Sequence, residues 1–204
     1  MLKKYFIVFF LGFSLAIFAQ EESSQFIKRG LVRADGSIMA GYMFKDNLSN
    51  VHLDGDMEYY LDNRISIRGS ASYLVGSSGL TSDSIGLKDF TAVYLGALYH
   101  FTTKGNFDPY VVLQPGIAYT SSYKATDTSS PNNTTKTETF PGAFSPLATV
   151  GVGFNYFFER YFHLFMETRY VYGNHLSKAP HPISLQEMRI TFGLGFNLCI
   201  KNKK

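Results

Sequence analysis

Large apolar residues alternate with small or polar residues along most of the chain beyond residue 30. The most regular example is the stretch 190–200, just before the C-terminal tail. Its even positions are all large and apolar and its odd positions are polar or small: Ile190, Phe192, Leu194, Phe196, Leu198 and Ile200 alternate with Thr191, Gly193, Gly195, Asn197 and Cys199. Successive side chains of a β-strand point to opposite faces. The pattern therefore predicts a strand with two unlike faces.

The same period of two marks eight segments, and no helical periodicity of useful length follows residue 20. The predicted strands are 36–44, 51–61, 65–75, 93–101, 110–120, 149–158, 162–172 and 190–200. Every second join is short, whereas the others are mostly longer and more polar, the longest being 124–143. Short turns on one rim and longer loops on the other predict an antiparallel up-and-down meander, with both chain ends on the short-turn rim. The composition of 124–143, rich in Ser, Thr and Asn, predicts a mobile, solvated loop.

The chain begins with MLKKYFIVFFLGFSLAIFAQ, two lysines followed by an apolar run and a small residue. This layout is typical of a secretory signal peptide, residues 1–19, cleaved near Ala19. Its removal takes away Lys3 and Lys4 and lowers the formal charge from +3 to +1, so the composition gives no case for nucleic-acid binding. The single Cys199 excludes an intramolecular disulfide, and we expect no metal and no cofactor. The predicted domain organisation is therefore the signal peptide, a short periplasmic N-terminal segment, 20–29, and a barrel domain, 30–201.

Alternation alone does not say which face of such a barrel points inward, because a soluble lipocalin-like barrel alternates equally well with its apolar face inside. The polar face is rich in glycine, which suits the narrow lumen of an eight-stranded barrel. It also carries both signs of charge in mid-strand: Glu58, Arg68, Glu167 and Arg169. Buried charges need partners. We therefore predict that the apolar face meets lipid and that these four residues form an interior ionic network. The network is expected to fill the lumen, with a proton or ion path as the alternative.

The pattern over residues 30–201 resembles the small bacterial outer-membrane β-barrels, the group of OmpX and the OmpA membrane domain, often labelled porin-family proteins. The predicted fold class is thus an all-β, eight-stranded antiparallel up-and-down transmembrane barrel. The sharpest local match is the spacing of a β-barrel sorting signal in the final strand: Thr191, Gly193, Phe196 and Leu198. The resemblance implies an outer-membrane location with both termini periplasmic, and contact with outer-membrane lipid and lipopolysaccharide. It also implies assembly with periplasmic chaperones and the barrel-assembly machinery, and we expect a monomer.

The segment HLSKAPHPISLQE resembles a catalytic motif of PagL, an outer-membrane lipid A deacylase. In that hypothesis Ser177 attacks an acyl ester, His175 takes its proton and Glu187 orients the imidazole. If the preceding strand continues in register, however, His175 and Ser177 lie on the interior face, whereas a lipid hydrolase needs them to face the membrane. The favoured interpretation is a non-enzymatic barrel with a structural or surface-interaction role through its loops. A PagL-like enzyme and a narrow pore are the alternatives. His100 and His163 are expected to be ordinary residues at the membrane interface.

Overall fold

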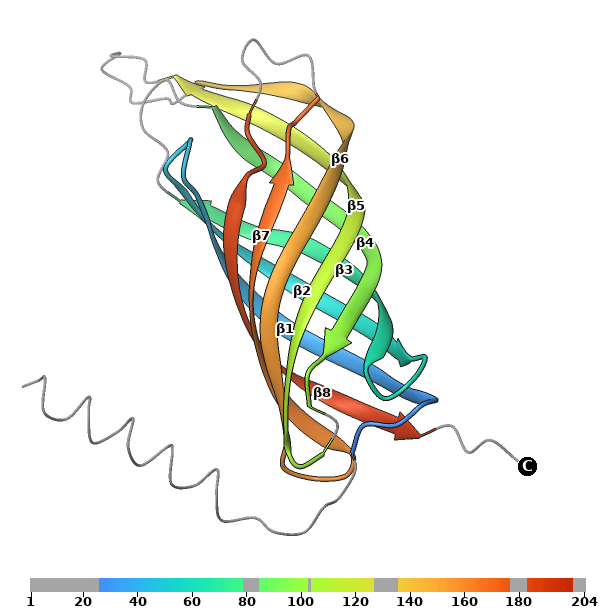
Figure 1. The fold of residues 1–204 in the computed structure, drawn as a ribbon. Helices are drawn as coiled ribbons and strands as arrows, with labels where there is room; N and C mark the ends of the chain where they lie inside the picture. Colours follow the sequence, from blue (N-terminus) through green and yellow to red (C-terminus); the bar gives the residue numbers. More distant parts are fainter. Residues whose placement is uncertain (1–25, 79–84, 103, 127–135, 177–182, 200–204) are drawn as a thin grey trace, which may run out of the picture.

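The computed structural model describes residues 26–78, 85–102, 104–126, 136–176 and 183–199. Eight antiparallel strands follow one another in chain order and close into a barrel, with β1 pairing with β8 (Figure 1). The strands are β1 (Leu31–Met43), β2 (Leu48–Tyr60), β3 (Ile65–Ser78), β4 (Ile85–His100), β5 (Phe107–Thr126), β6 (Lys136–Phe157), β7 (Phe162–Gly173) and β8 (Glu187–Cys199). The predicted eight-stranded up-and-down barrel is confirmed. The predicted signal peptide, 1–19, and the end of the predicted barrel domain, 200–201, lie outside the described residues.

The two faces of each strand differ as the alternation predicts, and β8 shows the difference most clearly. Phe192 is 62% exposed on the outside of the barrel, whereas its neighbour Thr191 is fully buried inside. The other even positions of β8 up to Leu198 are also outward and exposed. A continuous outer belt of exposed large apolar side chains is typical of a barrel that spans a membrane. No segment of the described part forms a helix long and apolar enough to cross a membrane.

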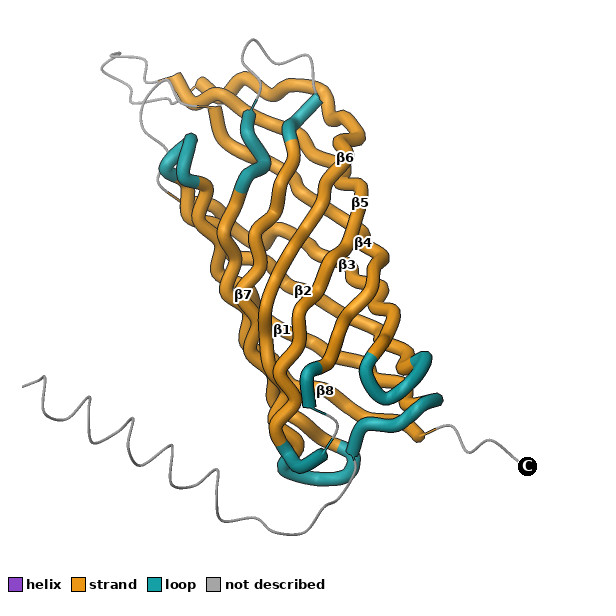
Figure 2. The backbone as a smooth tube through the Cα atoms, in the orientation of Figure 1, coloured by secondary structure: helices purple, strands orange, loops and turns teal. Residues whose placement is uncertain are grey.

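The joins between β2 and β3, β4 and β5, and β6 and β7 lie at the same rim as the two ends of the barrel domain, and we name this rim the turn end (Figure 2). The opposite rim, which also carries the short join between β1 and β2, is the loop end. The turn between β2 and β3 is fixed by Asp62, whose carboxylate accepts hydrogen bonds from the backbone N–H groups of Arg64, at 2.6 Å, and Ile65, at 2.8 Å. These two bonds favour the ionised form and hold the pKa of Asp62 below its ordinary value. The tight turn between β4 and β5 uses Gly105 at a φ of 82°, a conformation that favours glycine.

The predicted 124–143 loop is wrong in its described parts. β5 continues to Thr126 and β6 begins at Lys136, so a long hairpin projects at the loop end (Figure 1). The ladder shifts register at a bulge between Thr120 and Ser122. Threonine suits strands well, and strands that project beyond the apolar belt need no apolar face. A composition rich in Ser, Thr and Asn is therefore compatible with strands at this end of the barrel and does not by itself indicate a loop. Residues 127–135 lie outside the described part.

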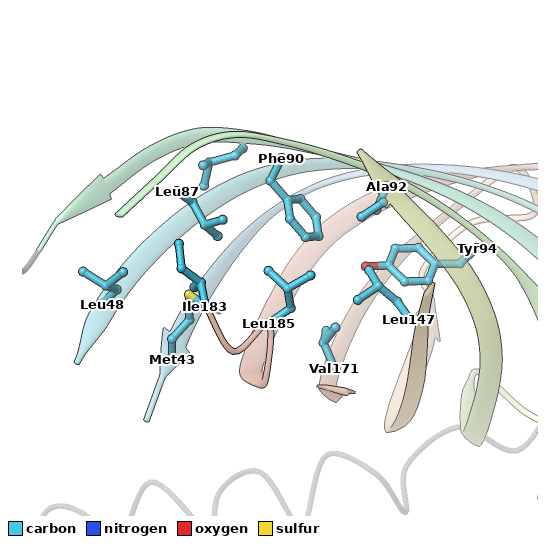
Figure 3. Packing of buried hydrophobic residues seen from close by; sticks show 12 residues of the cluster. Met43, Leu48, Leu87, Phe90, Ala92, Tyr94, Leu147, Val171, Ile183 and Leu185 are labelled. Carbon is cyan, nitrogen blue, oxygen red and sulfur yellow. The ribbon is translucent and has the colours of Figure 1, made fainter. Parts of the chain in front are cut away.

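Apolar side chains close the inside of the barrel near both rims. The loop-end cluster includes Ile183 and Leu185 from the segment before β8, which pack with the ends of β1 and β2 and with β4 (Figure 3). Its members are Met43, Leu48, Leu74, Leu87, Phe90, Ala92, Tyr94, Ala118, Leu147, Val171, Ile183 and Leu185. The turn-end cluster consists of Ile27, Leu31, Tyr60 and Phe157. The Phe26 ring stacks on the ring of Phe157, with centroids 5.2 Å apart. A third buried apolar cluster consists of Leu98, Tyr110 and Val112, so apolar and polar side chains share the interior.

Candidate functional site

Glu58, on the inward face of β2, is the centre of the polar interior. Its carboxylate accepts hydrogen bonds from Arg33 on β1, at 2.6 Å, and from Arg68 on β3, at 2.9 Å. The Ser66 hydroxyl donates a third bond at 2.7 Å, and the His100 Nε2 lies 3.2 Å away. All of these side chains are buried. A carboxylate enclosed by two guanidinium groups meets the condition under which a buried charge is tolerated.

A second carboxylate, that of Glu167 on β7, continues the network across the lumen. It accepts hydrogen bonds from Arg68 at 2.7 Å, from Arg169 at 2.6 Å and from the Tyr110 hydroxyl at 2.8 Å. The four residues that the sequence singles out, Glu58, Arg68, Glu167 and Arg169, are thus joined in one continuous chain of ion pairs. β3 and β7 are not neighbours in the barrel wall. The link between Arg68 and Glu167 therefore ties opposite sides of the barrel together.

His100 and His163 are not at the membrane interface, and that prediction is wrong. Both imidazoles are fully buried inside the barrel. His100 Nδ1 lies 2.9 Å from both carboxylate oxygens of Asp108, and His163 Nε2 lies 3.1 Å from Asp35. Their positions follow from strand parity, because His163 lies between the outward Phe162 and Leu164. The alternation pattern itself therefore contained the signal that both histidines are inward.

Near the loop end, Glu187 and Arg189 form a further buried ion pair on β8, with Arg189 Nε 2.7 Å from the Glu187 carboxylate. The Asn50 amide donates a hydrogen bond to Glu187 at 2.8 Å, and the His52 Nε2 is 3.2 Å from the same oxygen. The Arg189 guanidinium also lies over the ring of Phe90, 4.9 Å from its centroid. Glu187 thus belongs to a second buried ionic group inside the barrel.

The structure does not assemble the proposed PagL-like catalytic group within its described part. His175 is buried and faces inward, and its Nδ1 contacts the hydroxyl of Thr120. Burial lowers the pKa of this imidazole. Among the described residues, no hydrogen bond joins His175 to Glu187, whose oxygens are engaged by the partners named above. Ser177 lies outside the described residues.

The residues of the predicted assembly signal occupy both faces of β8. Thr191 and Gly193 are inward, and Phe196 and Leu198 are exposed on the outer belt. Their role as a signal remains a prediction. Within the described part of the chain, no group of His, Cys, Asp or Glu side chains has an arrangement that could hold a metal ion.

Every strand contributes at least one buried polar side chain to the interior. One example from each, in strand order, is Arg33, Glu58, Arg68, His100, Asp108, Asn155, Glu167 and Arg189. An eight-stranded barrel is only wide enough for its own side chains to fill it. The chemistry that this arrangement supports is charge pairing within the lumen.

No protein-family model and no curated protein sequence matches the chain. Solved structures do match its fold. OprG from Pseudomonas aeruginosa superposes with a TM-score of 0.60 at 13% identity, covering 86% of this chain and 99% of that one. Neisserial surface protein A gives a TM-score of 0.53 at 14% identity, covering 88% and 100%. The N-terminal β-barrel domain of Pseudomonas aeruginosa OprF gives 0.52 at 17% identity, covering 84% and 99%. The chain therefore has the fold of the small outer-membrane β-barrel proteins, as its resemblance to OmpX and the OmpA membrane domain implied.

Proposed function

We propose that the protein is a non-enzymatic barrel of the bacterial outer membrane, with a structural or surface-interaction role through its loop end. Its signal peptide is removed near Ala19, both termini are periplasmic, and the loops and the projecting β5–β6 hairpin face the cell exterior. The outward apolar belt and the fold of the matched proteins support this proposal.

The main support for the proposal is the set of ion pairs that crosses the lumen. The chain of ion pairs from Arg33 through Glu58, Arg68 and Glu167 to Arg169 crosses the interior. The turn-end and loop-end clusters lie on either side of it. An ion crossing the barrel would have to separate buried ion pairs, each of which costs several kcal/mol to break. We therefore infer that the lumen does not conduct.

Conductance in planar lipid bilayers tests this inference. The purified, folded protein should add no unitary current steps, while flotation of the same preparation with lipid vesicles shows that it inserts. Regular steps from inserted protein would contradict a closed lumen. A pore formed by the ionic network would also change conductance when Arg68 is replaced, and that result would establish the narrow-pore alternative.

Lipid A mass spectrometry tests the absence of enzyme activity. Cells with and without the protein should yield identical lipid A, and Ser177→Ala should change nothing. Loss of an acyl chain in the presence of the wild-type protein, restored in Ser177→Ala, would overturn the non-enzymatic proposal.

An epitope inserted between β5 and β6 tests the orientation of the barrel. Antibody should bind the epitope on intact cells, and binding only after lysis would contradict a loop end that faces the cell exterior.

We further propose that β8 carries the signal for the barrel-assembly machinery. Replacing Phe196 or Leu198 with Ser should slow the appearance of the folded, heat-modifiable form in cells. Phe192→Ser is a matched control, because Phe192 lies on the same outer face of β8 and outside the motif. Equal slowing by all three variants would indicate that lost lipid contact, rather than a signal, limits assembly.

A further inference from the structure

The interior of the barrel contains more acidic groups than basic ones. In the described part of the chain, seven carboxylates are buried there: Asp35, Asp54, Asp56, Glu58, Asp108, Glu167 and Glu187. Only four guanidinium groups accompany them: Arg33, Arg68, Arg169 and Arg189. An isolated charge is very costly to bury in a medium of low polarity. The excess of three negative charges therefore needs a counterpart within the lumen.

Each guanidinium can be assigned a carboxylate of its own. Arg189 pairs with Glu187 at 2.7 Å, and Arg169 pairs with Glu167 at 2.6 Å. The remaining two guanidinium groups share the turn-end half of the interior, where both contact Glu58, Arg33 at 2.6 Å and Arg68 at 2.9 Å. Arg33 also lies 3.5 Å from Asp35, so these two cations together balance Glu58 and Asp35. His52 and His163 contact Glu187 and Asp35, two acids that already have a guanidinium partner. This assignment leaves Asp54, Asp56 and Asp108 without a cation of their own.

Asp108 is compensated by His100. The two nitrogens of this imidazole face acceptors on opposite sides: Nδ1 is 2.9 Å from Asp108, while Nε2 is 3.2 Å from Glu58 and 3.0 Å from the Ser66 hydroxyl. An imidazole that donates from both nitrogens is the positively charged form. The neighbouring rings of Tyr60 and Tyr110 complete its surroundings. His100 is thus placed to hold one proton between two carboxylates.

Asp54 and Asp56 have no such partner. They lie two residues apart on the inward face of β2, and Asp56 is directly opposite Asp35 on β1. Among the described residues, Asp54 has only Arg169 within ion-pair distance, at 3.5 Å, and neither of its oxygens has a hydrogen-bond partner there. Asp56 accepts a hydrogen bond from Ser70, and its second oxygen is also unpartnered. Like charges placed this close disfavour ionisation of both groups.

The other charged groups that act on these two aspartates do not remove the excess. Arg68, Arg169 and Arg189 attract them, but each already has a closer carboxylate. Glu167 repels both. From this pairing we propose that the interior of the folded barrel binds three protons at neutral pH, one on His100 and one on each of Asp54 and Asp56. These protons make the lumen electrically neutral.

Folding at slightly alkaline pH therefore takes up protons, because aspartates are ionised and histidines mostly neutral in an unfolded chain. Uptake of three protons lowers the folding equilibrium constant by up to about a thousandfold for each pH unit of increase. The barrel is accordingly most stable near neutral or mildly acidic pH, and it loses stability as the pH rises. This property is independent of whether the protein conducts ions or binds a partner at its loop end.

The direct test is to count protons during folding. The urea-unfolded chain is diluted into weakly buffered zwitterionic micelles at pH 7.5, and a pH-indicator dye follows the proton uptake. Wild type should take up about three protons per chain and the double variant Asp54→Asn/Asp56→Asn about one. Asp62→Asn is the matched control, because Asp62 lies in an exposed turn, and it should behave as wild type. Uptake of less than one proton by the wild type would overturn the proposal, as would equal uptake by the double variant.

A second measurement on the folded wild type keeps the proposal testable if the double variant does not fold. Infrared spectra of protein labelled with isotopic aspartate should show the carbonyl band of a protonated carboxylic acid at neutral pH, and strongly alkaline pH should remove it. Absence of this band in the folded barrel would refute protonated aspartates. Nitrogen NMR of His100 tests the third proton. Protons on both ring nitrogens at neutral pH would support a charged imidazole, and a proton on one nitrogen alone would contradict it.

Discussion

Replacement of Glu58 by glutamine is the sharpest perturbation of the ionic network. The amide has the shape of the carboxylate but carries no charge. Glu58 contacts two guanidinium groups, those of Arg33 at 2.6 Å and Arg68 at 2.9 Å, and all three side chains are buried. The substitution therefore leaves two cations in the lumen without their shared anion.

The expected loss follows from the contacts that remain. Removing one partner of a buried ion pair typically costs about 3–5 kcal/mol. Arg68 keeps the carboxylate of Glu167 at 2.7 Å. Arg33 keeps the Tyr60 hydroxyl at 3.0 Å, but the one carboxylate that remains near it among the described residues is that of Asp35, at 3.5 Å. We therefore expect the free energy of unfolding to fall by about 3–5 kcal/mol in Glu58→Gln. Met57→Leu is the matched control, because Met57 is the preceding residue on the outer, lipid-facing side of β2. It should change stability by less than about 0.5 kcal/mol.

The assay is urea-induced unfolding in phospholipid vesicles at fixed pH and lipid ratio. The chain contains no tryptophan, so far-UV circular dichroism and the gel mobility of the unheated protein replace tryptophan fluorescence as probes. A loss below about 1 kcal/mol for Glu58→Gln would refute the argument, because it is the size expected for an ordinary net hydrogen bond. Such a result would mean that the interior is hydrated enough to screen its charges.

Three further substitutions test other parts of the fold. Gly195→Ala should destabilise the barrel by about 1–3 kcal/mol, because the new methyl group would collide with the carboxylate of Asp35. Gly36→Ala is the control, because its methyl group meets open space and should not destabilise the barrel. Equal urea midpoints for the two variants would contradict this packing. Leu194→Arg, on the outer face near the middle of β8, should cost about 2–4 kcal/mol in vesicles, and a neutral result would argue against lipid at that face. Asp62 should titrate below the ordinary aspartate pKa in an NMR titration. Its hydrogen bonds then stabilise the fold above the unfolded-state pKa, and this stabilisation is lost as the pH falls through the folded-state pKa. Asp62→Asn should therefore reduce the loss of stability at acid pH. An unchanged loss would show that other groups cause it.

The sequence predicts the two faces of each strand well, because a lipid-facing surface requires an apolar residue at every second position. The same requirement explains one failure. The start of β1 was not predicted, although Arg33 and Asp35 are inward there. Their outward neighbours Ala34 and Gly36 are small, so the contrast between the faces is weak. Two charged members of the interior were missed for this reason.

The partners within the lumen could not be predicted from alternation. The pair between Arg68 and Glu167 joins strands on opposite sides of the barrel, and only closure of the barrel brings them together. The apolar clusters were missed for a related reason. Phe157 and Leu185 point inward near the rims, where the lumen ends and apolar side chains cover the polar interior. Strand parity gives the face of a residue, but it does not give its height along the barrel.

Spin labelling of β8 in lipid vesicles tests whether the apolar face of the barrel meets lipid. Nitroxides are placed one at a time at the even positions from 190 to 198, and at Thr191 and Asn197 as inward-facing controls, in a Cys199→Ser background. Collision with oxygen and with a water-soluble nickel complex is measured by electron paramagnetic resonance. We expect high oxygen accessibility at the even positions, including Phe192 and Leu194, and low accessibility to both reagents at the two inward-facing controls. High accessibility to the nickel complex at the even positions would contradict a lipid-facing belt around a filled barrel.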